Sequence, residues 1–318
     1  MQKKIKETKG ITLVALIITV IILLILAGVT ISLVIGKNGL IAKSKESVEK
    51  YKDKAKEEQW QLEDFEAGME ELKDEEEHPE LKQMKLVLNV TEDNKEIELP
   101  VHTYSNDYKY DCTVNWGDGT TEQVTNENAK TTTHTYANTG TYTVTIEGTY
   151  ESLECNNSIR TALKKVEQWG ATGLKNVYLY DCTNLEEIAE PSKNSFVNIA
   201  SFDSTFLGCS SLTSIPERLF ANCPNVTSFE NTFSGCSSLT SLPERLFANC
   251  SNVTSFFCTF EYCTELTGKS IQLWNEELRQ EKGITENSGG GSCYYMCEKL
   301  EDYSQIPWYW TKSPPPPQ

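Results

Sequence analysis

Cysteine is the residue whose spacing in this sequence most suggests chemistry. Four of the eleven cysteines recur every 27 residues, at Cys182, Cys209, Cys236 and Cys263. A thiol can act as a nucleophile, ligate zinc, form a disulfide or pack as a small apolar group. Catalysis needs a neighbouring base, and no histidine occurs in the region of these cysteines. Zinc sites usually show paired Cys-x-x-Cys spacing or histidine partners, which are missing here. We therefore expect neither a thiol enzyme nor a metal site.

The other residues that could do chemistry are few. The three histidines, His78, His102 and His134, lie too far apart in sequence to suggest a metal-binding helix. Asp118 and His134 could each be catalytic or bind a metal, but an aspartate in a glycine turn more often bonds nearby backbone amides, and a histidine beside a tyrosine more often packs. The glycines at 289–291 lack the lysine of a phosphate-binding loop. No catalytic residue and no cofactor is expected.

The charge of the chain excludes another class of partner. It has 46 acidic and 29 basic side chains among 318 residues, a net charge of −17 and an isoelectric point near 4.7. Binding to nucleic acid requires clustered lysine and arginine to neutralise phosphates. We expect no nucleic-acid partner.

The cysteine interval belongs to an internal repeat. Residues 201–227 and 228–254 agree at 22 of 27 positions. Phenylalanines recur with the same interval at Phe206, Phe233 and Phe260. Because one short repeat cannot bury its own apolar face, identical positions of stacked repeats form ladders in a shared core. The repeat predicts that the cysteines are mainly such a ladder of buried thiols, with Cys223 and Cys250 in a second one.

Disulfides remain an alternative for the cysteines that break the period. Side chains of one ladder point the same way and approach poorly for a disulfide, even at the spacing of adjacent coils. Cys258 with Cys263, and Cys293 with Cys297, depart from the 27-residue interval and are the better disulfide candidates.

The repeat also resembles a known family. Its pattern, F-x-x-T-F-x-x-C-x-x-L-T-x-x-P-x-x-L-F-x-x-C-x-N-V-T-S, is similar to the BspA-type leucine-rich repeats of bacterial surface proteins and extends over about residues 159–310. The resemblance implies a leucine-rich-repeat solenoid over 154–312. It also implies an adhesin-like role, with an unknown protein or glycan ligand on host, matrix or other cells.

Residues 81–153 show a different pattern. The runs KLVLNV, YDCTVNW and TYTVTI alternate apolar and polar residues, which predicts strands of a β-sandwich. The turn Trp116, Gly117, Asp118 and Gly119, followed by HTYANTGTYTVTI at 134–146, resembles the PKD domain. That resemblance implies an immunoglobulin-like sandwich acting as a spacer or as a protein and carbohydrate contact module.

The N-terminal part predicts a membrane anchor. A basic leader at 1–10 precedes an uncharged run at 11–35, which is longer than the ~20 residues that cross a bilayer as a helix. The leading lysines place the N-terminus in the cytoplasm and the residues after about 36 outside the cell. A cleaved secretory signal is the alternative, although its apolar region is usually shorter.

The same stretch, KGITLVALIITVIILLILAGV, resembles the class III signal of type IV prepilins. The resemblance implies cleavage by a prepilin peptidase between Gly10 and Ile11 and methylation of the new N-terminus. The family usually has glutamate at the fifth mature position, where this chain has Ala15.

Together these features predict a multi-domain protein. The expected order is a transmembrane helix contacting lipid through 11–35, a charged helical stalk at 36–80, a PKD-like sandwich, a solenoid of 27-residue leucine-rich repeats, and a proline tail at 313–318. We expect a cell-surface protein, single-pass in the cell membrane, that adheres or binds a ligand through the repeats. The alternative is a minor pilin or pseudopilin of a type IV pilus or secretion apparatus.

Overall fold

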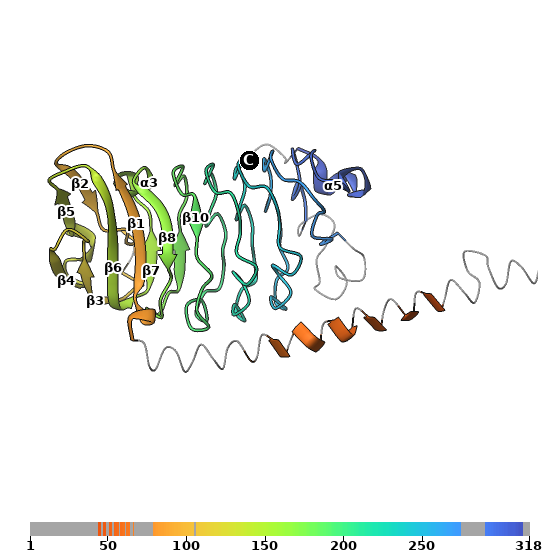
Figure 1. Cartoon of the computed structure of the whole chain (residues 1–318), viewed down its shortest axis with the longest axis horizontal. Helices are drawn as coiled ribbons and strands as arrows, with labels where there is room; N and C mark the ends of the chain where they lie inside the picture. The colour runs from red at the N-terminus through yellow and green to blue at the C-terminus, as the bar shows by residue number, and fades with distance from the viewer. Residues whose placement is uncertain are drawn as a thin grey trace, which may run out of the picture. The chain divides into compact units, whose positions relative to one another are not determined.

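The computed structural model describes residues 79–104, 106–274 and 290–313, together with individual positions between 44 and 66. The chain divides into two units, Met1–Met69 and Glu70–Gln318. In the first unit the described positions are α-helical. The second unit contains all the described strands and is shown with its element labels in Figure 1.

The second unit is built on one six-stranded mixed sheet. The strand order is β10-β8-β1-β6-β3-β4, and the bounds are Glu187–Ile188 for β10, Leu163–Gln168 for β8, Met84–Val90 for β1, Gly140–Tyr150 for β6, Tyr110–Asn115 for β3 and Thr121–Thr125 for β4. Within this sheet, β10 and β8 pair in parallel and the other neighbours are antiparallel. The three alternating runs of the sequence form β1, β3 and β6, and β3 buries every second residue.

Two small sheets and a few short helices complete the unit. The antiparallel pair β2 (Lys95–Glu98) and β5 (Thr133–Tyr136) forms one, and the parallel pair β7 (Ser152–Glu154) and β9 (Asn176–Tyr178) forms the other. The 3-10 helices are η1 (Pro79–Lys82), η2 (Ala129–Thr131) and η3 (Tyr303–Gln305), and the α-helices are α3 (Asn157–Arg160) and α5 (Trp308–Thr311). Each helix has four residues or fewer, so the unit is almost entirely strands and turns.

The expected fold class is wrong. Instead of an N-terminal helix, a separate sandwich and a solenoid, the described part of Glu70–Gln318 is a single β-rich body without a closed or solenoid sheet. Strand β1 pairs with β6 on one side and with β8 on the other, so strands from both predicted domains share one sheet. The two predicted regions also bury their apolar side chains in one continuous core.

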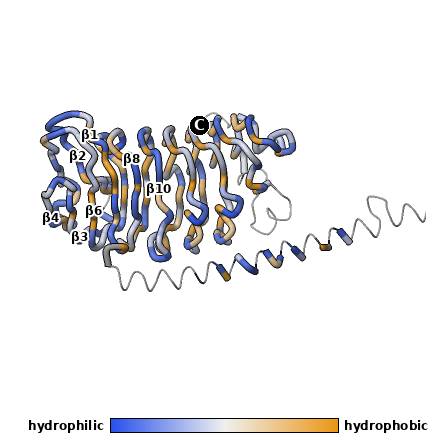
Figure 2. The backbone as a smooth tube through the Cα atoms, viewed as in Figure 1, coloured by the Kyte–Doolittle hydropathy of each residue, from blue (hydrophilic) through white to orange (hydrophobic). Residues whose placement is uncertain are grey.

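The repeats stack through turns rather than through long strands. Their only described bridges join Ser201 to Ser228 and Ser228 to Ser255. Each repeat contains a left-handed residue, Ser204, Asn231 or Cys258, with φ between 52° and 56°. A left-handed residue interrupts the extended backbone that a strand requires, so the 27-residue repeat produces stacked turns. Apolar and polar stretches alternate along these turns (Figure 2).

Aromatic rings form the core of the stacked repeats. The ring centre of Phe202 lies 5.7 Å from that of Phe229, and the ring centre of Phe229 lies 5.8 Å from that of Phe256. The rings are nearly parallel. A parallel column runs through Phe206, Phe233 and Phe260 and continues to Tyr294. Tyr294 stands three residues before Cys297, as Phe260 does before Cys263, so it occupies the phenylalanine position of the last repeat.

The structure also bears on the expected localisation. Among the described residues, no helix combines the length and the apolar character that crossing a bilayer requires. The expected single-pass location in the cell membrane is therefore contradicted for the part of the chain that the structure describes. The apolar run at 11–35 and the expected cleavage residues Gly10 and Ile11 lie outside the described residues.

Candidate binding site

The turn at 116–119 is a structural feature. The Oδ1 atom of Asp118 accepts hydrogen bonds from the backbone N–H of Thr120 at 3.0 Å and from its hydroxyl at 2.6 Å. The Oδ2 atom lies 2.9 Å from Nε2 of His134, whose ring stacks on Trp116 at 4.9 Å. Burial raises the pKa of Asp118, but the hydrogen bonds from Thr120 and His134 outweigh it and hold this pKa below its ordinary value. Asp118 and His134 are thus hydrogen-bond partners of each other.

The two glycines of this turn have left-handed backbones. Gly117 has φ of 84° and Gly119 has φ of 94°. A Cβ atom on Gly117 would lie 2.6 Å from the carbonyl oxygen of Thr143, whereas one on Gly119 would meet no atom within 4 Å. Gly117 is therefore required by both conformation and close packing, and Gly119 by conformation alone.

The cysteine ladder is buried and makes a repeated hydrogen bond. Cys182, Cys209, Cys236 and Cys263 are inaccessible to solvent. The thiols of Cys209, Cys236 and Cys263 each donate to a backbone carbonyl thirty residues earlier, at 3.2 Å. Burial raises the pKa of Cys209 and of Cys263 well above the ordinary value. A thiol held protonated in the core is neither a nucleophile nor a metal ligand.

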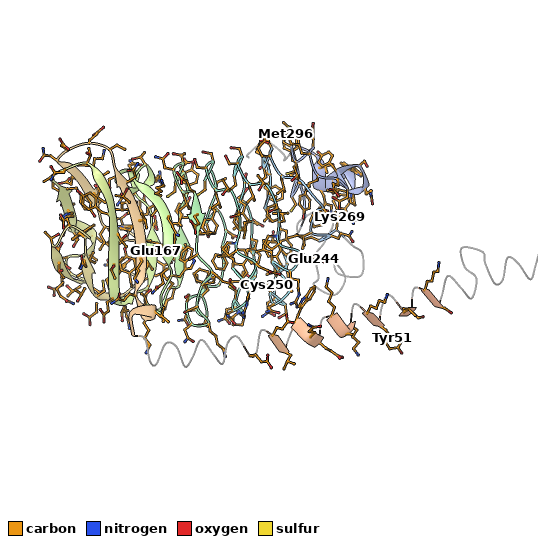
Figure 3. All side chains as sticks on the ribbon, in the orientation of Figure 1. Tyr51, Glu167, Glu244, Cys250, Lys269 and Met296 are labelled. Atoms are coloured by element: carbon orange, nitrogen blue, oxygen red, sulfur yellow. The ribbon has the colours of Figure 1, made fainter. Side chains whose placement is uncertain are left out.

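The two candidate disulfides do not form. All eleven cysteines are buried free thiols, including Cys258, Cys263, Cys293 and Cys297. Cys297 instead repeats the ladder bond, because its thiol donates to the carbonyl of Phe260 at 2.9 Å. The departure from the 27-residue interval reflects a longer repeat rather than a disulfide. Cys250, which is labelled in Figure 3, belongs to the second ladder, and its thiol donates to the carbonyl of Phe220.

Two neighbouring cavities are lined in part by residues of the repeats. The first has a volume of about 360 Å³, and its lining includes Gln168, Trp169, Glu190, Ser192, Arg218 and Asn222. The second, of about 240 Å³, is lined in part by Lys193, Asn194, Asn222 and Asn249. Asn222 lines both cavities, so they are neighbours, and we call the two together the repeat groove. The first cavity alone is in the size range of ordinary ligand sites.

The polar lining of the repeat groove follows from the repeat itself. Asn222 and Asn249 occupy equivalent positions 27 residues apart. Asn249 donates its side-chain N–H to the carbonyl of Ala221 at 3.2 Å, which fixes the orientation of its amide. Glu190 and Arg218 approach within 3.5 Å, so the groove presents both a donor and an acceptor. The indole N–H of Trp169 donates to the carbonyl of Ala189, which holds the apolar wall in place.

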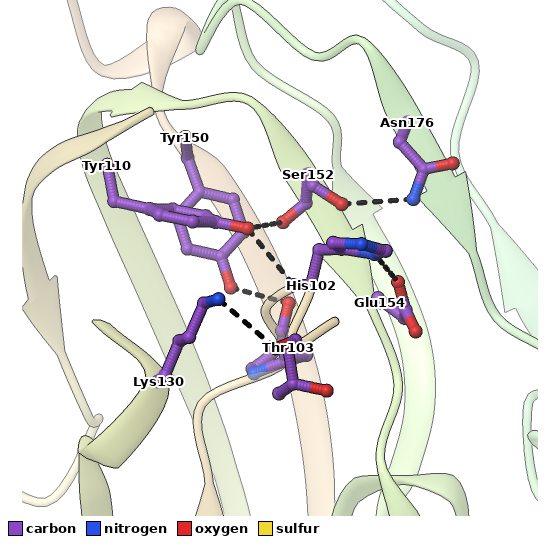
Figure 4. Close-up of polar contacts among 9 residues, drawn as sticks. His102, Thr103, Tyr110, Lys130, Tyr150, Ser152, Glu154 and Asn176 are labelled. Atoms are coloured by element: carbon purple, nitrogen blue, oxygen red, sulfur yellow. Dashed lines mark hydrogen bonds and ion pairs between the residues drawn. The ribbon is translucent and has the colours of Figure 1, made fainter. Parts of the chain in front are cut away.

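A second polar cluster lies where residues 100–110 meet β7 and β9. The Nδ1 atom of His102 lies 2.5 Å from Oε2 of Glu154 (Figure 4). Ser152, on the same strand as Glu154, accepts a hydrogen bond from the side chain of Asn176. Among the described residues, the His102 ring contacts the Glu154 carboxylate and the rings of Tyr104 and Tyr108, which is not the nucleophile–base pair of a catalytic triad.

Sequence reasoning did not find either location. The asparagines of the repeat groove carry a signal, because they recur as polar residues beside the second cysteine ladder. His102 and Glu154 carry no such signal, because they lie 52 residues apart and meet only where the segment after β2 packs against β7, with the Glu154 N–H donating to the Pro100 carbonyl. No group of three or more histidine, cysteine or acidic residues in the described part of the chain is arranged to hold a metal ion.

Comparison with known proteins adds no family. No family model, no curated protein and no solved structure matches this chain.

Proposed function

We propose that this chain is a non-catalytic binding protein that holds an extended protein or glycan ligand in the repeat groove. The observation that carries the proposal is the shared lining of the two cavities, in which successive repeats contribute equivalent amides, Asn222 and Asn249. Repeated amides at a fixed spacing suit a ligand that is itself extended and repetitive, as repeat proteins commonly bind on their long surfaces. This is the chemistry that adhesion requires.

The chemistry of the described residues supports binding over catalysis. The thiols for which a pKa shift is resolved are held protonated by burial, and the rings of His102 and His134 each pair with a carboxylate. Binding through polar side chains in a preformed depression needs neither a nucleophile nor a base. The pilin alternative depends on 1–35, outside the described residues, and stays a prediction.

The test is to fill the repeat groove and measure adhesion. The full chain carrying Asn222→Leu and Asn249→Leu is compared with the wild type on immobilised collagen, fibronectin, laminin and a panel of glycans. Removing both amides while adding bulk should weaken binding to any recognised surface by about tenfold or more.

The matched control places leucine at equivalent exposed positions outside the groove lining. Ser214 and Ser241 are 27 residues apart and exposed, so Ser214→Leu with Ser241→Leu should bind as the wild type does. Circular dichroism and thermal unfolding check that both double variants fold. A wild-type chain that binds none of the surfaces, or a groove variant that binds normally, would contradict the proposal.

A further inference from the structure

An aromatic surface surrounds the pair formed by His102 and Glu154. The ring of Tyr104 is 89% exposed and lies edge-on to the His102 ring at 5.9 Å. Tyr108 approaches the same histidine at 5.0 Å, also edge-on. One exposed ring and several half-buried ones gathered in one place form an apolar patch, and contiguous apolar patches on a protein surface mark interaction sites. We call the group His102, Tyr104, Tyr108, Glu154, Tyr178 and Tyr180 the tyrosine surface.

Strand pairing places the other two tyrosines on this surface. In the parallel pair of β7 and β9, Glu154 stands opposite Tyr178. Tyr178 stacks on Tyr180 at 5.8 Å with an interplanar angle of 25°. The guanidinium group of Arg160 lies 5.0 Å from the ring centre of Tyr180. Glu154 thus lies between two sets of rings, one from the loop and one from β9 and the residues after it.

Hydrogen bonds fix the loop that carries His102 and Tyr104. The backbone N–H of His102 donates to the Tyr110 hydroxyl at 3.0 Å, and that hydroxyl donates to the carbonyl of Ser152 at 3.4 Å (Figure 4). Lys130 donates to the carbonyl of Thr103 at 3.1 Å. The backbone that carries these side chains is therefore held in place before any ligand arrives, which lowers the entropic cost of binding.

We propose that the tyrosine surface is a second binding site, independent of the repeat groove, for a neutral saccharide. A pyranose ring has faces of C–H bonds and an edge of hydroxyl groups. The negatively polarised face of a tyrosine ring attracts the C–H face. Glu154 and Asn176 offer an acceptor and a donor beside the rings for the hydroxyl groups, which is the combination of apolar wall and few polar groups seen in small-ligand sites.

Charge selects a neutral ligand over an ionic one. A carboxylate among tyrosines could also hold a quaternary ammonium ion. Here Arg160 lies over Tyr180, and Lys175 pairs with Glu151 at 2.8 Å close to Tyr108, so two cations border the surface. An anionic ligand is disfavoured by Glu154 and by the net charge of −17. The hydroxyl groups of a neutral saccharide can both donate and accept hydrogen bonds, so they interact favourably with the carboxylate and with the two cations.

The experiment is calorimetric titration of the full chain with hexasaccharides of glucose, N-acetylglucosamine and mannose. We expect the wild type to bind at least one of them. Tyr104→Ala should weaken that binding about fivefold or more, and adding Tyr178→Ala should weaken it further, because stacking surface is removed. Tyr104→Phe retains the ring and should bind within about threefold of the wild type.

Three controls make the outcome specific. Trp308→Ala removes another exposed ring, 72% exposed and lying in α5, and should leave binding unchanged. Asn222→Leu with Asn249→Leu fills the repeat groove and should also leave it unchanged, which separates this site from the proposed function. Tetramethylammonium should not compete. A wild type that binds no hexasaccharide, a Tyr104→Ala variant that binds normally, or displacement by tetramethylammonium would each overturn the proposal.

Discussion

The thiol of Cys236 donates a hydrogen bond to the backbone carbonyl of Phe206, thirty residues earlier, over 3.2 Å. The cysteine is fully buried, and the carbonyl that it serves belongs to Phe206 of the preceding repeat, whose ring stacks on Phe233. A thiol suits this position because it is small and apolar yet can donate one weak hydrogen bond. The recurrence of cysteine every 27 residues thus has a structural cause.

Removing this thiol should destabilise the repeats. Cys236→Ala deletes the bond to Phe206 and leaves a small cavity, so the free energy of unfolding should fall by about 1–3 kcal/mol. Urea denaturation followed by circular dichroism measures the change. Ser241→Ala, at an exposed position of the same repeat, should stay within about 0.5 kcal/mol of the wild type. Equal stabilities of the two variants would show that the thiol contributes nothing.

The two glycines of the 116–119 turn should differ in their tolerance of alanine. Gly119→Ala adds a Cβ atom in open space and should cost about 1 kcal/mol, from its left-handed backbone alone. Gly117→Ala adds the same backbone cost and also a contact of 2.6 Å with the Thr143 carbonyl. It should therefore cost about 2–4 kcal/mol. Thermal unfolding of both variants compares them, and a reversed order would refute the close packing.

Asp118 should make stability depend on acid. Its pKa is lowered in the folded state, since the hydrogen bonds from Thr120 and His134 outweigh the effect of burial. The unfolded value is about 3.9, so this contribution is complete above that pH and is lost as the pH falls through the folded pKa. Asp118→Asn should be less stable than the wild type at pH 7 and should lose less stability on acidification.

Thr120→Val provides a graded comparison. It removes the hydroxyl bond to Asp118 at 2.6 Å but retains the backbone bond at 3.0 Å. Its acid dependence should therefore lie between those of the wild type and Asp118→Asn. Urea midpoints measured from pH 7 to pH 3 give the three curves. Parallel curves for all three proteins would mean that these bonds do not shift the titration of Asp118.

Periodicity in the sequence predicted the contacts better than it predicted the architecture. The 27-residue interval identified Phe206, Phe233 and Phe260 as a column, and these rings do stack. It did not predict turns in place of strands, because that depends on left-handed backbones at non-glycine residues such as Ser204 and Asn231. Nor does a local pattern reveal that β1 pairs with β8, since the pairing joins regions about 80 residues apart.

The same limit explains the candidate sites. Asp118 and His134 stood out because glycine and tyrosine neighbours mark a turn and a strand, and the two residues prove to be partners. Tyr104 and Tyr178 have no common motif. Tyr178 comes opposite Glu154 only when β7 and β9 pair, and Tyr104 lies beside His102, which bonds to the same carboxylate. Surfaces assembled from three distant segments carry no signal in any one of them.

Thiol labelling tests the corrected view of the late cysteines. Burial raises the pKa of Cys293 well above the ordinary value and that of Cys297 to about 12, so both should resist iodoacetamide at pH 8 in the folded protein. After unfolding without reductant, all eleven cysteines should be alkylated, as counted by mass spectrometry. The same count with reductant present is the control. Two thiols that react only after reduction would reveal a disulfide, and peptide mapping would show whether it joins Cys293 to Cys297.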